Sequence, residues 1–266
     1  MTMTEAAHRT DAAGAHLLVD GSRSAALLDW ADGRGMSAAT ALLAGGLARA
    51  VEEGRDEFVT GFLAVPQVAT GAALDWLLWL WADAPSSMRA RLTREEDVLA
   101  AEEVMAMHRH VRDGGRFAAA EWRAARRRFA SAISSDASTQ VVEAIAASMW
   151  DLSETPGAIA DVAQSWINGM AMIDAIVASG WTVDDHQRFE ETWAAFGIAH
   201  ARQNRREPDE DDAAFAARQQ RYMSENPIGL SESDFARNSA WSDERQRRMQ
   251  HRAAELRAGL LTLVER

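Results

Sequence analysis

The sequence of 266 residues contains no cysteine, and all 28 of its basic residues are arginine because lysine does not occur. Without thiols the chain forms no disulfide, thiolate nucleophile or cysteine-ligated metal site, which is typical of proteins from a reducing compartment. Without lysine it has neither a standard P-loop, whose lysine reaches the nucleotide phosphates, nor a pyridoxal phosphate Schiff base. We predict no cofactor for this chain.

Metal-ligand spacing is also missing. His108 and His110 are two residues apart, so on a helix they point about 200° away from each other and cannot share an ion. His186 and Glu190 are four residues apart and can meet, but one such pair is more often a surface contact than a metal site. We predict no metal.

Two enzyme-like patterns fail on their context. The run Gly33-Arg-Gly35-Met-Ser-Ala38 matches a loose dinucleotide-binding fingerprint, which requires a preceding strand. Residues 24–30 look helical instead, so we interpret the run as a glycine turn followed by a helix cap at Ser37. No Gly-x-Ser-x-Gly elbow occurs, and no catalytic residue is predicted.

Long apolar runs are lacking. The most apolar stretch, Ala72–Ala82, contains three tryptophans but is shorter than the ~20 residues that a spanning helix needs. We predict that it is the central helix of a globular core, with an interfacial membrane helix as the alternative. The N-terminus shows no basic segment followed by an apolar one, so no secretion signal is expected. A cytoplasmic protein that does not bind membranes is predicted.

What the sequence does contain is apolar residues at helical spacing. The clearest series ends at Gly180 and comprises Ile159, Val162, Trp166, Met170, Ile173 and Val177. Further stripes are Ala118, Trp122, Ala125, Phe129 and Ala132, then Phe189, Trp193, Phe196 and His200. We predict an all-α fold, either an irregular multi-helix bundle or stacked helical hairpins.

Helix boundaries are predicted from capping residues and helix breakers. The predicted starts are a cap at Ser37, capping boxes at Thr93–Glu96 and Thr182–Asp185, and Thr155-Pro156. The Ser37 helix is expected to reach about Glu53, and a terminal helix is expected over Trp241–Arg266.

The composition changes after residue 200. Residues 202–221 are dense in Arg, Gln, Asp and Glu, and the run Glu207–Asp212 breaks the helical pattern. We predict a main helical domain over 1–206, and an acidic loop with C-terminal helices over 207–266 that packs on the same domain.

The net charge of −12 argues against nucleic acid as a partner and favours long-range attraction of a basic one. Two groups are candidate partner-binding residues, with ordinary solvated surfaces as the alternative interpretation. The first is an arginine strip, Arg116, Arg123, Arg126 and Arg127. The second is an acidic run, Glu207, Asp209, Glu210, Asp211 and Asp212.

One pair of segments resembles a known family. Phe117–Phe129 and Val142–Trp150 look like the paired alanine-rich helices of bacterial immunity proteins, over about sixty residues of the chain. The resemblance implies a non-enzymatic cytosolic protein that binds a cognate toxin and occludes it. No family contact residue can be transferred to this sequence.

These observations favour a non-enzymatic helical protein that binds another protein, including the case of an immunity or antitoxin factor that blocks a basic toxin. One alternative is an enzyme whose acidic, histidine and arginine residues meet only in the folded chain. A second alternative is a helical regulator that binds a small ligand.

Overall fold

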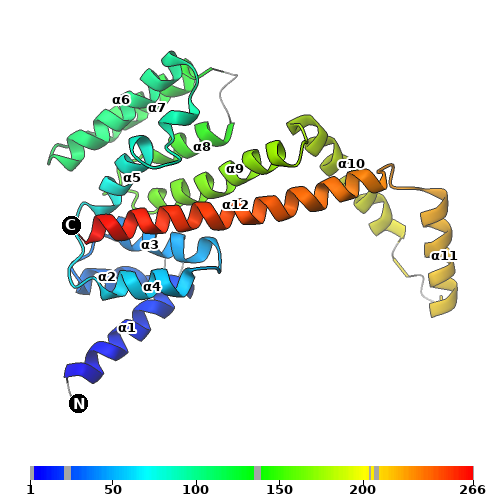
Figure 1. The fold of residues 1–266 in the computed structure, drawn as a ribbon, viewed down its shortest axis with the longest axis horizontal. Coiled ribbons are helices and arrows are strands. Elements are labelled where there is room, and N and C mark those ends of the chain that lie inside the picture. Colours follow the sequence, from blue (N-terminus) through cyan, green and yellow to red (C-terminus); the bar gives the residue numbers. More distant parts are fainter. Residues whose placement is uncertain (1–2, 21–24, 135–138, 204, 207–209, 266) are drawn as a thin grey trace. The chain divides into compact units, whose positions relative to one another are not determined.

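The computed structural model describes residues 3–20, 25–134, 139–203, 205–206 and 210–265. Within them the chain forms α-helices, one 3₁₀ turn (Arg89–Arg91) and no strand, which confirms the predicted all-α class. The helices (Figure 1) are α1 (Met3–Asp20), α2 (Ala25–Gly33), α3 (Ala38–Ala50), α4 (Arg55–Ala64), α5 (Ala72–Ala82), α6 (Glu95–Arg112), α7 (Ala119–Ala132), α8 (Thr139–Ser148), α9 (Ala158–Ala178), α10 (Val183–Gln203), α11 (Asp212–Glu225) and α12 (Glu232–Val264).

The helices group into two compact units. Unit 1 comprises Met1–Ala171 and Arg248–Arg266, and unit 2 comprises Met172–Arg247. Both division points lie within helices, one in α9 and one in α12. The domain boundary drawn from composition at residue 206 stays a prediction.

Helix α5 is at the centre of unit 1, with the bounds expected from the sequence. Trp76, Leu80 and Trp81 have no solvent exposure. The indole Nε1 of Trp76 donates to the carbonyl of Leu256 at 3.1 Å, and that of Trp81 donates to Oε2 of Glu102 at 2.8 Å. Both polar ends of these buried rings are therefore satisfied, as is usual for buried tryptophan. In the described part of the chain, no helix has the length and apolar character to cross a membrane.

The last turns of α12, at the C-terminal end of the helix (Figure 1), carry a side chain that caps α3. Arg257 is 3% exposed. Its guanidinium donates to the carbonyls of Leu47 at 3.0 Å, Val51 at 2.6 Å and Glu53 at 2.5 Å. The carbonyls at the end of α3 lack partners within the helix, so Arg257 supplies the missing donors and a favourable charge.

Ser37 caps α3 as predicted, because its Oγ accepts from the amide of Thr40 at 3.2 Å. Helix α2 ends at Gly33, the first glycine of the run, and Gly35 has a φ of 66°. The glycine turn is confirmed in place of a nucleotide loop. Helix α3 ends at Ala50, earlier than expected, and Gly54 begins α4 instead.

Three other predicted boundaries are wrong. Helix α9 begins at Ala158, two residues after the predicted start at Pro156. No side chain caps α6, which begins at Glu95 rather than with a capping box at Thr93; three acidic residues in its first turn stabilise the amide end instead. Helix α12 begins at Glu232, well before Trp241. A reciprocal pair of bonds between Ser231 and Asp234 starts it.

Unit 2 buries little apolar surface for its length. Its core consists of Ala175, Ile176, Trp181, Phe189 and Trp241. The capping box at Thr182–Asp185 is confirmed, but the apolar face predicted for the following helix is buried only at Phe189. Trp193 is 46% exposed, and Val177 at the end of α9 is 74% exposed. Apolar spacing predicts a helix here but does not show which face is covered.

Candidate binding site

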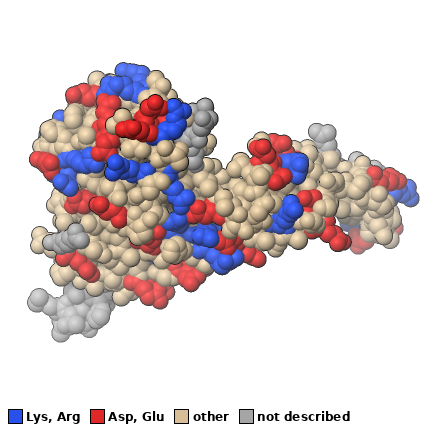
Figure 2. All heavy atoms as spheres, turned by 45° about the horizontal axis from the view of Figure 1, so that its top comes forward, with Lys and Arg blue, Asp and Glu red and all other residues tan. Residues whose placement is uncertain are grey.

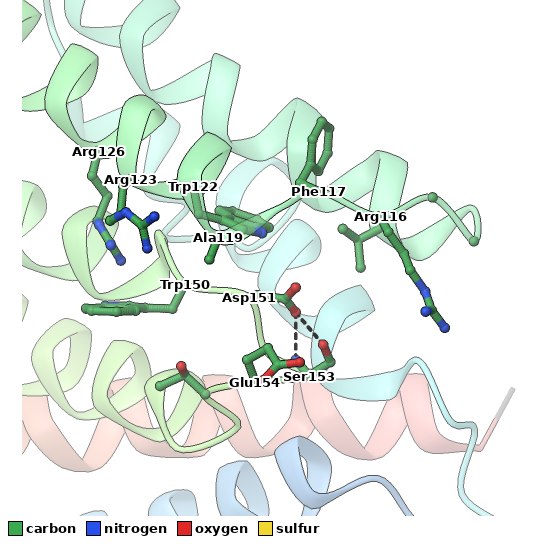
Figure 3. A pocket seen from close by; sticks show the side chains of 14 residues that line it. Arg116, Phe117, Ala119, Trp122, Arg123, Arg126, Trp150, Asp151, Ser153 and Glu154 are labelled. Carbon is green, nitrogen blue, oxygen red and sulfur yellow. Dashed lines mark hydrogen bonds between the residues drawn. The ribbon is translucent and has the colours of Figure 1, made fainter.

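A half-open pocket of about 740 Å³ lies in unit 1, where the α6–α7 loop, one face of α7 and the α8–α9 loop meet. Such a volume falls within the range of about 300–1,000 Å³ typical of ligand sites. Figure 3 shows Arg123 and Arg126 reaching from α7 toward Trp150, while Asp151, Ser153 and Glu154 belong to the loop below. Arg116 lies at the opposite end of the pocket from Arg123.

The periodicity of α7 produces this arrangement. Trp122, Ala125 and Phe129 are buried at helical spacing, so the residues next to them on the flank of the helix, Arg123 and Arg126, reach the pocket. The helix begins where a side-chain oxygen of Glu121 accepts from the amide of Ala118 at 2.7 Å. Alanine has no side-chain acceptor to return this bond.

Glycines bring the preceding loop close to α6. Gly114 has a φ of 91°, which favours glycine. A Cβ atom on Gly115 would come within 2.1 Å of Nε2 of His110. The close turn places Phe117 5.0 Å from the ring of His110 and 6.1 Å from that of Trp122, between ring centroids. Aromatic side chains thus line the interior of the pocket.

Arg126 is held in place, whereas Arg123 and Arg116 are not. The guanidinium of Arg126 lies 3.8 Å from the ring centroid of Trp150, and its Nη1 donates to the carbonyl of Met149 at 3.3 Å. The Trp150 side chain stays 43% exposed. No hydrogen bond or ion pair joins Arg116 or Arg123 to another described residue, so both keep their donors for a ligand.

One of the two carboxylates on the acidic side of the pocket already accepts hydrogen bonds from its own loop. Asp151 Oδ1 accepts from the amide of Ser153 at 2.9 Å and from its hydroxyl at 2.7 Å. The carboxylate of Glu154 has no partner among the described side chains. The pocket therefore presents three guanidinium groups and two carboxylates around an aromatic interior.

A buried histidine supports this interior from behind. His108 is 1% exposed, its ring centroid lies 4.9 Å from that of Trp122, and its Nε2 is 2.6 Å from the carbonyl of Ser148. Burial lowers the pKa of His108 to about 4, against smaller opposing effects of the Ser148 bond and Asp151. The imidazole is thus neutral near pH 7, and its Nε2–H donates to the carbonyl of Ser148. This hydrogen bond joins α6 to the end of α8.

Three of the four predicted arginines line the pocket: Arg116, Arg123 and Arg126. Arg127 does not, because it lies in a shallow hollow with Ser131 and Arg128. Arg128 is engaged by Glu103, whose Oε1 accepts from its Nε at 2.9 Å. The predicted strip is therefore divided between two surfaces of the same helix.

The predicted acidic run is in unit 2, and its described residues have partners close in sequence. Glu210 pairs with Arg218 through two bonds of 2.8 and 2.7 Å. Asp211 caps α11 by accepting from the amide of Ala214 at 2.7 Å, and Asp212 pairs with Arg206. Glu207 and Asp209 lie outside the described residues. A role for this run in partner binding stays a prediction.

Trp150, Asp151 and Glu154 are pocket residues that the sequence did not indicate. Their loop follows a helix end, and neither periodicity nor spacing predicts that it folds against α7. An exposed tryptophan directly after a helix was the one available signal. His200, the last member of the stripe predicted for α10, stacks between Phe196 and Tyr222, with ring centroids 5.5 and 6.0 Å away.

Charges of both signs are mixed on the face shown in Figure 2, where acidic and basic side chains lie next to one another. The net charge of −12 is therefore not concentrated in one acidic patch on this face. The pocket beside α7 has charges of both signs in its lining as well, three arginines and two carboxylates. Side-chain recognition there depends on local groups, since charges farther apart than about 10 Å are screened at 0.1 M salt.

In the part of the chain that the structure describes, no three His, Asp or Glu side chains gather as metal ligands would. No family model matches the sequence, and no curated protein or solved structure is similar to it.

Proposed function

We propose that this chain is a non-enzymatic, cytoplasmic protein that binds another protein through the pocket beside α7. The observation that carries the proposal is the grouping of Arg123, Arg126 and the half-exposed Trp150 in one concave site. Arginine and tryptophan are the residue types most enriched at the energetic centres of protein interfaces. The cysteine-free composition suits a reducing cytoplasm.

The rigid side of the pocket also favours binding. Arg126 is held on Trp150 before any partner arrives, so little side-chain entropy is lost when a partner contacts this pair. Arg123 remains available beside it. A prearranged pair next to a free cation suits an interface anchor.

Within this proposal, the partner is a bacterial toxin that the chain occludes. The support is the resemblance of Phe117–Phe129 and Val142–Trp150 to immunity proteins. Most of the arginine and tryptophan side chains of the pocket come from these two stretches. The pocket would then belong to the surface that covers the toxin.

The test is recovery of the tagged full chain from its native host, together with the variants Arg123→Glu and Arg127→Glu. We expect a stoichiometric protein partner on the wild type and on Arg127→Glu, but not on Arg123→Glu. Of the two substituted arginines, Arg123 lines the pocket and Arg127 does not. Raising the salt from about 0.1 M to about 1 M should weaken recovery, since the screening length falls from about 10 Å to about 3 Å. A wild-type chain that is recovered alone under gentle conditions contradicts the proposal.

The toxin-blocking version has its own test. The recovered partner is expressed alone and together with the chain, and growth of the host is measured. We expect growth arrest by the partner alone and normal growth when the chain is present, with Arg123→Glu failing to protect. A partner that is harmless by itself would leave protein binding in place and eliminate the immunity role.

A further inference from the structure

We infer that the pocket recognises a peptide segment that carries a carboxylate next to a large apolar side chain. This inference rests on the proposed function, because it names the part of the partner that enters the pocket. The shared chemistry has two sources, a C-terminal carboxylate and an internal Asp or Glu, and the experiment below separates them.

The carboxylate is assigned to the side of the pocket formed by Arg123 and Arg126. These residues are three apart on α7, so their side chains lie on the same side of the helix. Arg123 makes no hydrogen bond or ion pair with another described residue, and Arg126 uses one Nη1 donor on Met149, which leaves further N–H groups. Planar guanidinium groups bind carboxylates through paired, charge-assisted hydrogen bonds.

A second observation points to an acceptor in the ligand. Trp122 lines the pocket and is 3% exposed, yet its Nε1–H has no acceptor among the described residues. A buried donor without an acceptor costs free energy. A ligand oxygen reached through a small displacement of the neighbouring side chains would satisfy this indole.

The apolar part of the ligand is assigned to the aromatic interior. Phe117 and Trp122 meet edge to face with an interplanar angle of 79°, and the exposed ring of Trp150 forms the wall beneath Arg126. Flat apolar groups pack favourably against such rings. The volume of about 740 Å³ has room for a large side chain and the adjoining backbone.

The acidic side distinguishes a peptide from a phosphate compound. Asp151 and Glu154 add two negative charges to the lining, and these repel a doubly charged phosphate. They attract the N–H groups of a peptide backbone, and the unpartnered carboxylate of Glu154 is available to accept from one. Only a ligand with both an anion and hydrogen-bond donors suits both sides.

The test measures binding of three short peptides to the full chain by calorimetry. The probes are acetyl-Gly-Ala-Phe with a free carboxylate, the same peptide as its C-terminal amide, and acetyl-Gly-Glu-Phe-Gly amide with an internal carboxylate. We expect saturable binding of at least one carboxylate peptide, with affinity about tenfold higher than that of the uncharged amide, as expected for one charge-assisted hydrogen bond. Preference for the first or the third probe identifies the source of the carboxylate.

Variants on the same helix provide the matched control. Arg123→Gln should lower the affinity for the preferred peptide about tenfold, whereas Arg127→Gln, which lies outside the pocket, should change it less than about twofold. In nitrogen-15 spectra, the indole N–H signal of Trp122, assigned by its loss in Trp122→Phe, should shift on binding.

The absence of any peptide binding would overturn the inference, and so would three other results. They are equal binding of the amide peptide, tighter binding of inorganic phosphate than of any peptide, and equal losses in the Arg123→Gln and Arg127→Gln variants. The two proposals fail separately. If a partner is recovered on the wild type but not on Arg123→Glu, and no peptide binds, the proposed function stands and this inference is wrong. If a peptide binds and no partner is recovered, this inference stands and the proposed function is wrong.

Discussion

Replacing Arg257 by methionine is expected to lower the free energy of unfolding of unit 1 by about 3–5 kcal/mol. Methionine retains much of the packing volume but donates no hydrogen bond, so the carbonyls of Leu47, Val51 and Glu53 lose their shared partner. A hydrogen bond to a charged group contributes about 1.5–3 kcal/mol, and a buried acceptor left without a donor adds its own cost. The loss belongs with the large effects seen when a buried network is broken.

The measurement is chemical denaturation followed by far-ultraviolet circular dichroism and tryptophan fluorescence. Arg123→Met is the control, because Arg123 is exposed and makes no interaction with a described residue. Its effect should stay within about 0.5 kcal/mol. If Arg257→Met costs no more than this control, the capping role of Arg257 is wrong.

Burial lowers the pKa of Arg257 from its ordinary value, and the nearby charge of Arg55 lowers it further. A guanidinium nevertheless keeps its proton in proteins. Arg257→Lys is therefore the informative second variant, since it keeps the charge but loses the planar set of donors. We expect it to be intermediate between the wild type and Arg257→Met.

The second large effect is a loss of stability in mild acid that depends on His108. The pKa of His108 is about 4 in the folded chain and 6.5 in its ordinary state. Between these values the unfolded chain binds a proton that the folded chain does not, so stability falls as the pH drops. The gap of about 2.5 pKa units corresponds to about 3 kcal/mol, since each unit is worth about 1.36 kcal/mol.

This loss of stability is absent well above pH 6.5, grows as the pH falls from 6.5 to 4, and is complete below pH 4. The matched variant is His108→Gln, whose amide N–H can donate to the carbonyl of Ser148 but does not titrate. Unfolding free energies of both proteins are measured from pH 7.5 to 4. The carboxylates titrate in both, so only the difference between the two curves reports His108. Parallel curves would contradict the assigned pKa.

The sequence was sufficient to predict which residues of α5 and α7 are buried in the interior of unit 1. Apolar residues on all sides of Ala72–Ala82 predicted a buried helix, and Trp76 and Trp81 are fully buried there. The stripe at Trp122, Ala125 and Phe129 likewise faces inward. Both predictions depend on the local spacing of apolar residues, because that spacing determines which face of a helix is buried.

Features that depend on distant residues could not be predicted. The apolar series of α9 continues to Val177, but the residues of that turn that are buried are Ala175 and Ile176, and Val177 is exposed. The three arginines of the pocket could be predicted as a group because they are close in sequence, on α7 and in the loop just before it. Trp150 and Glu154 could not, since their loop reaches the pocket only through the packing of α8 against α6, where His108 bonds Ser148.

The position of Arg257 in the chain has a consequence for synthesis on the ribosome. Its carbonyl partners in and after α3 are made about 210 residues earlier, and the Trp76–Leu256 bond spans 180 residues. Domains whose contacts are distant in sequence fold slowly, because a long loop must close first. The nascent N-terminal helices therefore lack these contacts until the segment around Leu256 and Arg257 has been made, and over that interval their incomplete core exposes apolar surface that favours aggregation.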